Sequence, residues 1–186
     1  MTISLTRAQI DTALPEVAKG LEQYLWLQKN RGNGDLQWNL EFRRRFNRFY
    51  RVRRNKEWQD KFYGLLESGK EKVVSFPEVF AALHRATGRH EASFASKLLA
   101  TLDPRMPVID SIVLKNLGMR LPAAGSKDRA ARICQLHLSL SSCFIGYLAT
   151  QDGRYLVNRF REKYLCGDVT EVKMLDFVLW QTRENA

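Results

Sequence analysis

An aspartate stands directly behind an apolar run in the middle of the chain. Asp110 follows Pro107-Val108-Ile109 and precedes a predicted helix over residues 111–117. A carboxylate that is partly removed from water can activate a water molecule, or stabilise the positive charge that develops on a sugar as a base departs. The same carboxylate can instead cap the helix by accepting a backbone hydrogen bond. The two roles can coexist, so Asp110 is the candidate catalytic residue.

A turn with a single glycine lies about twenty residues earlier. Gly88 separates two predicted helices, residues 75–87 and 91–102. Glycine permits a tight turn, and the exposed amides at the start of the next helix can meet a phosphate. The side chains nearby that could contact nucleic acid are Arg89, His90, Ser93 and Lys97. The alternative for Gly88 is an ordinary glycine at a helix end, and for His90 it is a surface histidine. The alternative for Ser93 is a small residue that permits close helix packing.

A third feature is the basic aromatic segment over residues 41–56, EFRRRFNRFYRVRRNK, which has seven arginines, one lysine and one acid. On a helix its phenylalanines share one face, which is predicted to be core. The arginines predicted to fan across another face are Arg43, Arg44, Arg48 and Arg51. That face could lie along phosphates with strongly salt-dependent affinity. The alternative is a solvated face, or ion pairs with Asp35, Glu41 and Glu57.

Helical periodicity recurs along the chain, whereas no run alternates apolar and polar residues as a strand would. About nine helices are predicted, over residues 7–29 with a bend at Pro15, 35–50, 58–69, 75–87, 91–102, 110–117, 126–148, 152–164 and 168–180. The predicted caps are Asp35, Ser75 and Asp168, the last with Glu171 three residues on. The fold class is therefore all-α, a compact globule.

Composition sets the broad class. The 186 residues are 45% apolar, enough for one sizeable core, so we expect a single all-α domain over residues 1–186. The chain could also divide into lobes, residues 1–75 with 122–186, around a hairpin-containing region 76–121. The formal charge of +10 favours a polyanionic partner, with nucleic acid first and an acidic protein or membrane second.

Several classes of site have no signal in the sequence. The chain has no leader pattern and no eighteen apolar residues together, so we expect a cytoplasmic protein without a membrane partner. Cys134, Cys143 and Cys166 are widely spaced and lack a CxxC motif, which favours reduced thiols. His137, inside a long apolar helix, is predicted to be a hydrogen-bonded core residue. Neither a metal site nor a cofactor is predicted.

The order helix, glycine turn, helix, then PVIDSIVLKNL resembles the helix-hairpin-helix DNA glycosylase superfamily, over residues 80–121. The resemblance implies that Asp110 takes the place of the family's catalytic aspartate and Gly88 that of a hairpin glycine. In that family the hairpin grips the DNA backbone while the target nucleotide is swung out into a pocket between two helical lobes.

The sequence departs from the family pattern in three ways. The hairpin Ala86-Thr87-Gly88-Arg89 has one glycine instead of two, and a four-cysteine cluster is absent. Family members that cleave the DNA backbone through a Schiff base carry a lysine at the start of the second hairpin helix. This chain has no lysine there. Lys97 lies two turns deeper in the helix, so the role of nucleophile is not assigned to it. The resemblance therefore implies a monofunctional DNA repair hydrolase that releases a flipped, damaged or modified base. The alternatives are a non-catalytic nucleic-acid-binding protein on the same scaffold, and a helical protein–protein module.

Overall fold

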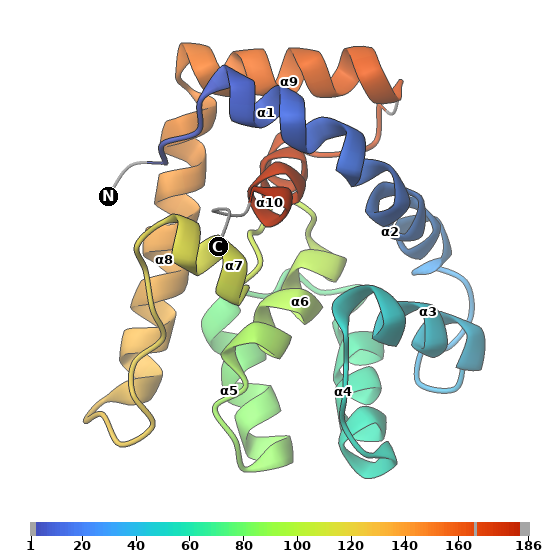
Figure 1. Cartoon of the computed structure of the whole chain (residues 1–186). Coiled ribbons are helices and arrows are strands. Elements are labelled where there is room, and N and C mark those ends of the chain that lie inside the picture. Colours follow the sequence, from blue (N-terminus) through green and yellow to red (C-terminus); the bar gives the residue numbers. More distant parts are fainter. Residues whose placement is uncertain (1–2, 166, 183–186) are drawn as a thin grey trace. The chain divides into compact units, whose positions relative to one another are not determined.

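The computed structural model describes residues 3–165 and 167–182, and the regular structure there is entirely helical (Figure 1). These residues form ten α-helices and one 3-10 helix: α1 (Arg7–Ala13), η1 (Leu14–Val17), α2 (Ala18–Asn30), α3 (Leu40–Tyr50), α4 (Lys56–Gly69), α5 (Phe76–Thr87), α6 (Ala92–Leu102), α7 (Ser111–Asn116), α8 (Arg129–Leu148), α9 (Gln151–Tyr164) and α10 (Glu171–Gln181). The predicted all-α class is confirmed.

The helices group into two compact units. Unit 1 comprises Met1–Lys19 and Pro104–Ala186, and unit 2 is the continuous segment Gly20–Asp103. The basic aromatic segment and the glycine turn both belong to unit 2. Asp110 belongs to unit 1. The candidate binding residues and the candidate catalytic residue are thus carried by different units.

Unit 1 is organised around α10. Seven consecutive residues of this helix, from Lys173 to Leu179, are buried, because η1, α7, α8 and α9 all pack against it (Figure 1). Two of the seven are charged, and they neutralise each other: Lys173 Nζ lies 2.6 Å from Asp176 Oδ2. Pro15 lies in the first turn of η1, the 3-10 helix between α1 and α2, where a residue without a backbone N–H is tolerated.

A sharp joint connects α8 and α9. The two helices meet at an angle of 81°, and Thr150 caps α9 by accepting a hydrogen bond from the Gly153 N–H at 3.0 Å. Gly153 is buried against the end of α8. Among the described residues no single helix combines the length and apolarity of a membrane span. Helices α8 and α9 reach that length and apolarity only when they are taken together across their bend.

Unit 2 has an aromatic core. Phe46 of α3 is fully buried, and its ring centroid lies 4.7 Å from that of Tyr50, 5.5 Å from that of Phe62 and 5.7 Å from that of Tyr63. Helix α5 packs against both α4 and α6. The prediction that the aromatic residues of the basic segment are core is confirmed for Phe42, Phe46 and Tyr50.

Two of the predicted helix caps are wrong. Asn39, not Asp35, caps α3 by accepting from the Phe42 N–H at 3.0 Å, while Asp35 accepts from Gln37 in the preceding turn. Likewise Thr170, not Asp168, caps α10 by accepting from the Lys173 N–H. In each case a capping residue closer to the helix start takes the role. Ser75 is confirmed as the cap residue of α5, with its N–H and hydroxyl both donating to the Glu78 carboxylate.

Replacing Gly153 by alanine should destabilise unit 1. The new Cβ would lie 2.2 Å from the carbonyl oxygen of Tyr147 and 2.7 Å from the Cα of Leu148, and backbone atoms cannot move aside as a side chain can. We expect a loss of at least about 2 kcal/mol in the free energy of unfolding, measured by urea denaturation.

The matched control is Gly146→Ala in α8. A Cβ atom there meets nothing within 4 Å, and alanine favours a helix over glycine by up to about 1 kcal/mol. Equal stability of the two variants would contradict the close approach at Gly153.

Candidate nucleic-acid interface

The outward face of α3 carries two adjacent arginines. Arg44 and Arg48 are one helical turn apart and exposed, and neither side chain has a hydrogen-bond or ion-pair partner among the described residues. Arg45 differs, because it pairs with Glu41 at 2.9 Å and stacks over the Trp26 ring at 4.1 Å from its centroid. The helix ends at Arg51, an exposed residue with a left-handed backbone (φ 54°).

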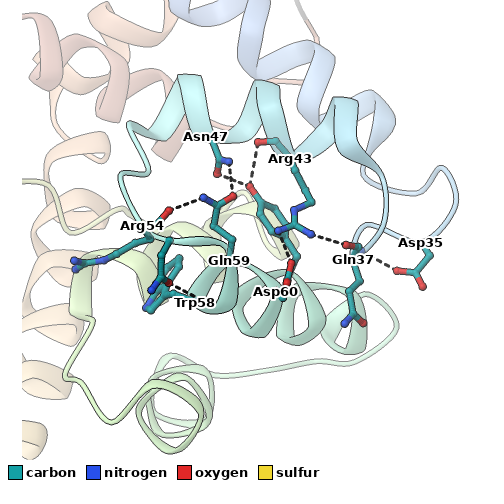
Figure 2. Close-up of polar contacts among 10 residues, drawn as sticks. Asp35, Gln37, Arg43, Asn47, Arg54, Trp58, Gln59 and Asp60 are labelled. Carbon is teal, nitrogen blue, oxygen red and sulfur yellow. Dashed lines mark hydrogen bonds and ion pairs between the residues drawn. The ribbon is translucent and has the colours of Figure 1, made fainter.

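Arg43 departs from the predicted outward fan. Its side chain is buried against α4, where its guanidinium lies 2.7 Å from Asp60 Oδ1 and donates to the Gln37 carbonyl at 3.0 Å (Figure 2). The guanidinium also stacks 4.8 Å from the centroid of the Tyr63 ring. Arg43 therefore holds α3 to α4, and its charge is already neutralised within unit 2.

A chain of hydrogen bonds continues from this pair along the seam between α3 and α4 (Figure 2). The Tyr63 hydroxyl donates to Asn47 Oδ1 at 2.7 Å, and Asn47 Nδ2 donates to Gln59 Oε1 at 2.9 Å. Gln59 Nε2 in turn donates to the Arg54 carbonyl at 2.6 Å. Burial raises the pKa of Tyr63, so this hydroxyl stays protonated as a donor. The network fixes the backbone that leads from α3 into α4.

The predicted helical hairpin is present in unit 2. Helix α5 ends with Gly88 as its cap: the Gly88 N–H donates to the His84 carbonyl at 2.8 Å, and its left-handed backbone (φ 69°) turns the chain out of the helix. A Cβ atom at Gly88 would meet nothing, so the backbone angle alone favours glycine here. The next residue, Arg89, is exposed, and its side chain has no partner among the described residues.

The other hairpin candidates are less accessible. The half-buried His90 stacks on His84, with ring centroids 4.4 Å apart. Ser93 is also half-buried, and its carbonyl accepts from the Ser96 hydroxyl. Lys97 donates to the Tyr50 carbonyl at 3.3 Å, which ties α6 to the end of α3. Arg89 is thus the exposed side chain of this set.

A hollow of about 400 Å³ lies at the start of α4, beside the hairpin turn. We call it the α4 hollow. Four of its lining side chains are cationic, namely Arg53, Arg54, Lys61 and Arg89. Glu57 is the one carboxylate in its lining, and Asn55, Trp58 and Thr87 complete it.

Two of the four cations in the α4 hollow are already neutralised. Arg54 pairs with Glu91 at 3.0 Å, and Lys61 pairs with Glu57 at 2.7 Å. Arg53 and Arg89 are exposed and have no side-chain partner among the described residues. The sequence prediction did not include Arg53, Arg54, Trp58 or Lys61, which line the hollow, among the candidate binding residues. The signal that could have found them is the pair of arginines directly before Asn55, which caps α4.

Asp110 caps α7 in unit 1. Its Oδ1 accepts from the Ile112 N–H at 2.8 Å, and its other carboxylate oxygen has no hydrogen-bond partner among the described residues. The side chain is half-exposed, while Val108 and Ile109 before it are buried. Asn116, at the other end of α7, donates to two carbonyls near the end of α10. The carboxylate of Asp110 is therefore held in place by its helix, and its second oxygen is available to accept a further hydrogen bond.

The other titratable candidates of unit 1 are structural. His137 is buried, and its Nε2 lies 3.3 Å from the carbonyl of Pro107, which confirms the predicted hydrogen-bonded core histidine. Burial lowers the pKa of His137 to about 4, so the ring is neutral. Cys134 and Cys143 are half-buried and form no disulfide, and Cys166 lies outside the described residues. Within the described ranges, no group of three or more histidine, cysteine, aspartate or glutamate side chains is arranged to hold a metal ion.

The resemblance to the helix-hairpin-helix DNA glycosylases rests on residues 80–121. Comparison of the chain with protein-family models, curated proteins and solved structures finds no match. The hairpin belongs to unit 2 and Asp110 to unit 1, so each carries its own functional proposal.

Arg43 and Arg44 are neighbours with different roles, which substitution by methionine should separate. Arg43→Met leaves the half-buried Asp60 carboxylate without its cation, and we expect the free energy of unfolding to fall by about 2–4 kcal/mol. Arg44→Met removes an unpartnered surface charge, so its effect should stay within about 0.5 kcal/mol. Urea denaturation of both variants measures the difference. Similar losses for the two would show that Arg43 does not join α3 to α4.

Proposed function

We propose that this protein binds the phosphate backbone of nucleic acid through exposed arginines of unit 2, and that the favoured nucleic acid is DNA. One observation carries the proposal. Arg44, Arg48, Arg53 and Arg89 are exposed and have no side-chain partner among the described residues. Arginine forks bidentately onto phosphate oxygens, and it is weakly hydrated, so an unpartnered guanidinium is well suited to this contact.

The charge of the whole chain supports the same partner. A formal charge of +10 attracts polyanions at long range, and phosphate contacts convert that attraction into binding by releasing counterions. Contacts of this kind fix register and orientation without reading sequence. We therefore expect little sequence preference.

Removing two of these arginines should change the salt dependence in a countable way. Each phosphate contact contributes about −0.9 to the slope of log K against log salt for duplex DNA. For Arg44→Gln with Arg48→Gln we expect the slope to become shallower by about 1.8, with weaker binding at low salt. Fluorescence anisotropy with a labelled duplex, over a series of NaCl concentrations, measures it.

A charge-matched control uses Arg120→Gln with Arg132→Gln, two exposed positions of unit 1. This variant has the same net charge but keeps the arginines of unit 2, so its slope should stay close to that of the unsubstituted protein. Equal slopes in both double variants would remove α3 from the interface. Affinity for the duplex with no salt slope would contradict phosphate binding.

A second candidate function, a DNA N-glycosylase, is favoured by the state of Asp110. Its carboxylate is half-exposed, fixed by one hydrogen bond and free to use its second oxygen. In the proposed reaction water attacks the sugar C1′ and the bond from C1′ to the base nitrogen breaks. The base leaves with the bonding electrons and takes up a proton from solvent, to which Asp110 later releases the proton that it accepts. Asp110 would stabilise the cationic sugar and accept the proton of the attacking water.

Asp110→Asn tests this second function without removing the helix cap. The asparagine side chain keeps an oxygen for the Ile112 N–H, so the fold and DNA affinity should persist. The rate of base release should fall by roughly 100-fold or more, because general acid–base groups contribute about that much. Release is measured by alkaline cleavage of labelled duplexes that carry deaminated, alkylated or oxidised bases.

The control for this test is Asp168→Asn, which changes an exposed carboxylate of the same unit. Its rate should equal that of the unsubstituted protein. If the unsubstituted protein releases no base from any of these duplexes, or if Asp110→Asn releases base at the same rate, the glycosylase proposal fails. The backbone-binding proposal would then stand alone.

A further inference from the structure

We infer that the α4 hollow binds one phosphate group. This inference deepens the proposed function, and it rests on that function only for the source of the phosphate. Four independent features of unit 2 meet in this hollow: the start of a long helix, a buried donor without a partner, two unpaired arginines and room for a ligand.

The first feature is the start of α4, a helix of 14 residues. Asn55 caps it by accepting from the Trp58 N–H at 3.0 Å. The amides of Lys56 and Glu57 have no hydrogen-bond partner among the described residues. Unpaired amides and the helix dipole together favour an anion at this end of a helix.

The second feature is the indole of Trp58, which is one of the residues lining the hollow. The side chain is 93% buried, since its residual exposure is 7%, and it is fixed between the rings of Phe62 and Phe94. Its Nε1–H is buried but has no hydrogen-bond partner. A buried donor left unpaired is costly, and an oxyanion that reaches it from the hollow would supply the missing acceptor.

The third feature is the charge of the lining. Arg53 and Arg89 approach the hollow from two different segments, the α3–α4 connection and the hairpin turn, and neither has a side-chain partner among the described residues. Two guanidinium groups can hold a tetrahedral oxyanion from two sides. The hairpin glycine therefore serves to place Arg89.

Two carboxylates lie close to the site and must be considered. A hydrogen bond from Lys61 lowers the pKa of Glu57, so this carboxylate is charged, but it is largely exposed and can turn toward water with its lysine. Glu91 is neutralised by Arg54, whose guanidinium also stacks over Phe94 at 5.2 Å from its centroid. Arg53 and Arg89 then remain as net positive charge for a ligand.

The volume of the hollow fits a phosphate with an attached sugar. At about 400 Å³ it lies within the range of ordinary ligand sites, which is roughly 300–1,000 Å³. The phosphate could be an internal diester of a strand, a terminal monoester or a free phosphate ion. All three present the same oxygens to Arg53, Arg89 and the indole.

The test follows the indole N–H of Trp58 by nuclear magnetic resonance. The chain has four tryptophans, so a ¹⁵N-labelled sample gives few indole signals, and Trp58→Phe identifies the one that matters. Sodium phosphate is titrated at constant ionic strength, with sodium chloride as the blank. We expect the Trp58 signal to move saturably with phosphate and the signals of Trp26, Trp38 and Trp180 to stay. A Trp58 signal that does not move overturns the inference.

Arginine variants give a second readout that does not disturb the core. Arg53→Gln and Arg89→Gln should each weaken phosphate binding by about tenfold, or about 1.4 kcal/mol, because each removes a charge-assisted hydrogen bond. Arg45→Gln is the control, since this exposed arginine does not line the hollow and already pairs with Glu41. Equal weakening in the control would show that only general charge attraction is measured.

Oligonucleotides of one sequence, with a 5′-phosphate or a 5′-hydroxyl, identify the source. Tighter binding of the phosphorylated strand, with movement of the Trp58 signal, assigns a terminal monoester. Equal binding with the same movement assigns an internal diester. Salt-dependent strand binding without that movement rejects the α4 hollow but keeps the proposed function. Movement with inorganic phosphate, without binding of either strand, keeps the hollow and rejects the proposed function.

Discussion

The buried pair between Arg43 and Asp60 determines which way α3 faces. Because the guanidinium of Arg43 is held against α4, and Phe42 and Phe46 are buried on the same side of the helix, the opposite face of α3 points outward. Arg44 and Arg48 are therefore exposed. A segment with seven arginines is made compatible with a core by placing one of them inside with a matched acid.

The two units carry different kinds of candidate site. In unit 2 the seam between α3 and α4, fixed by hydrogen bonds from Tyr63 to Arg54, sets the backbone just before the α4 hollow. Binding of phosphate by this unit would thus depend on a network that itself touches no ligand. In unit 1 the ends of α7 are fixed by Asp110 and Asn116, and chemistry there would use a single carboxylate oxygen.

Local signals in the sequence predicted the helices, the glycine turn and the capping of α7 by Asp110, because each depends on neighbours within a few residues. The caps Asp35 and Asp168 were wrong because Asn39 and Thr170 compete at nearby positions. The burial of Arg43 could not be predicted, since its acid lies on another helix. The α4 hollow could not be predicted for the same reason, since Arg53 and Arg89 come to line one hollow only after folding.

The discontinuity of unit 1 has a consequence for synthesis on the ribosome. Unit 2 is one continuous segment, so its helices can pack as soon as Asp103 has left the exit tunnel. Met1–Lys19 precedes unit 2 in the chain, yet η1 packs against α10, which follows unit 2. The stretch that contains α1 and η1 therefore meets the helices that cover it, α9 and α10, only after unit 2 has been synthesised. During that interval its apolar residues are open to chaperones and to aggregation.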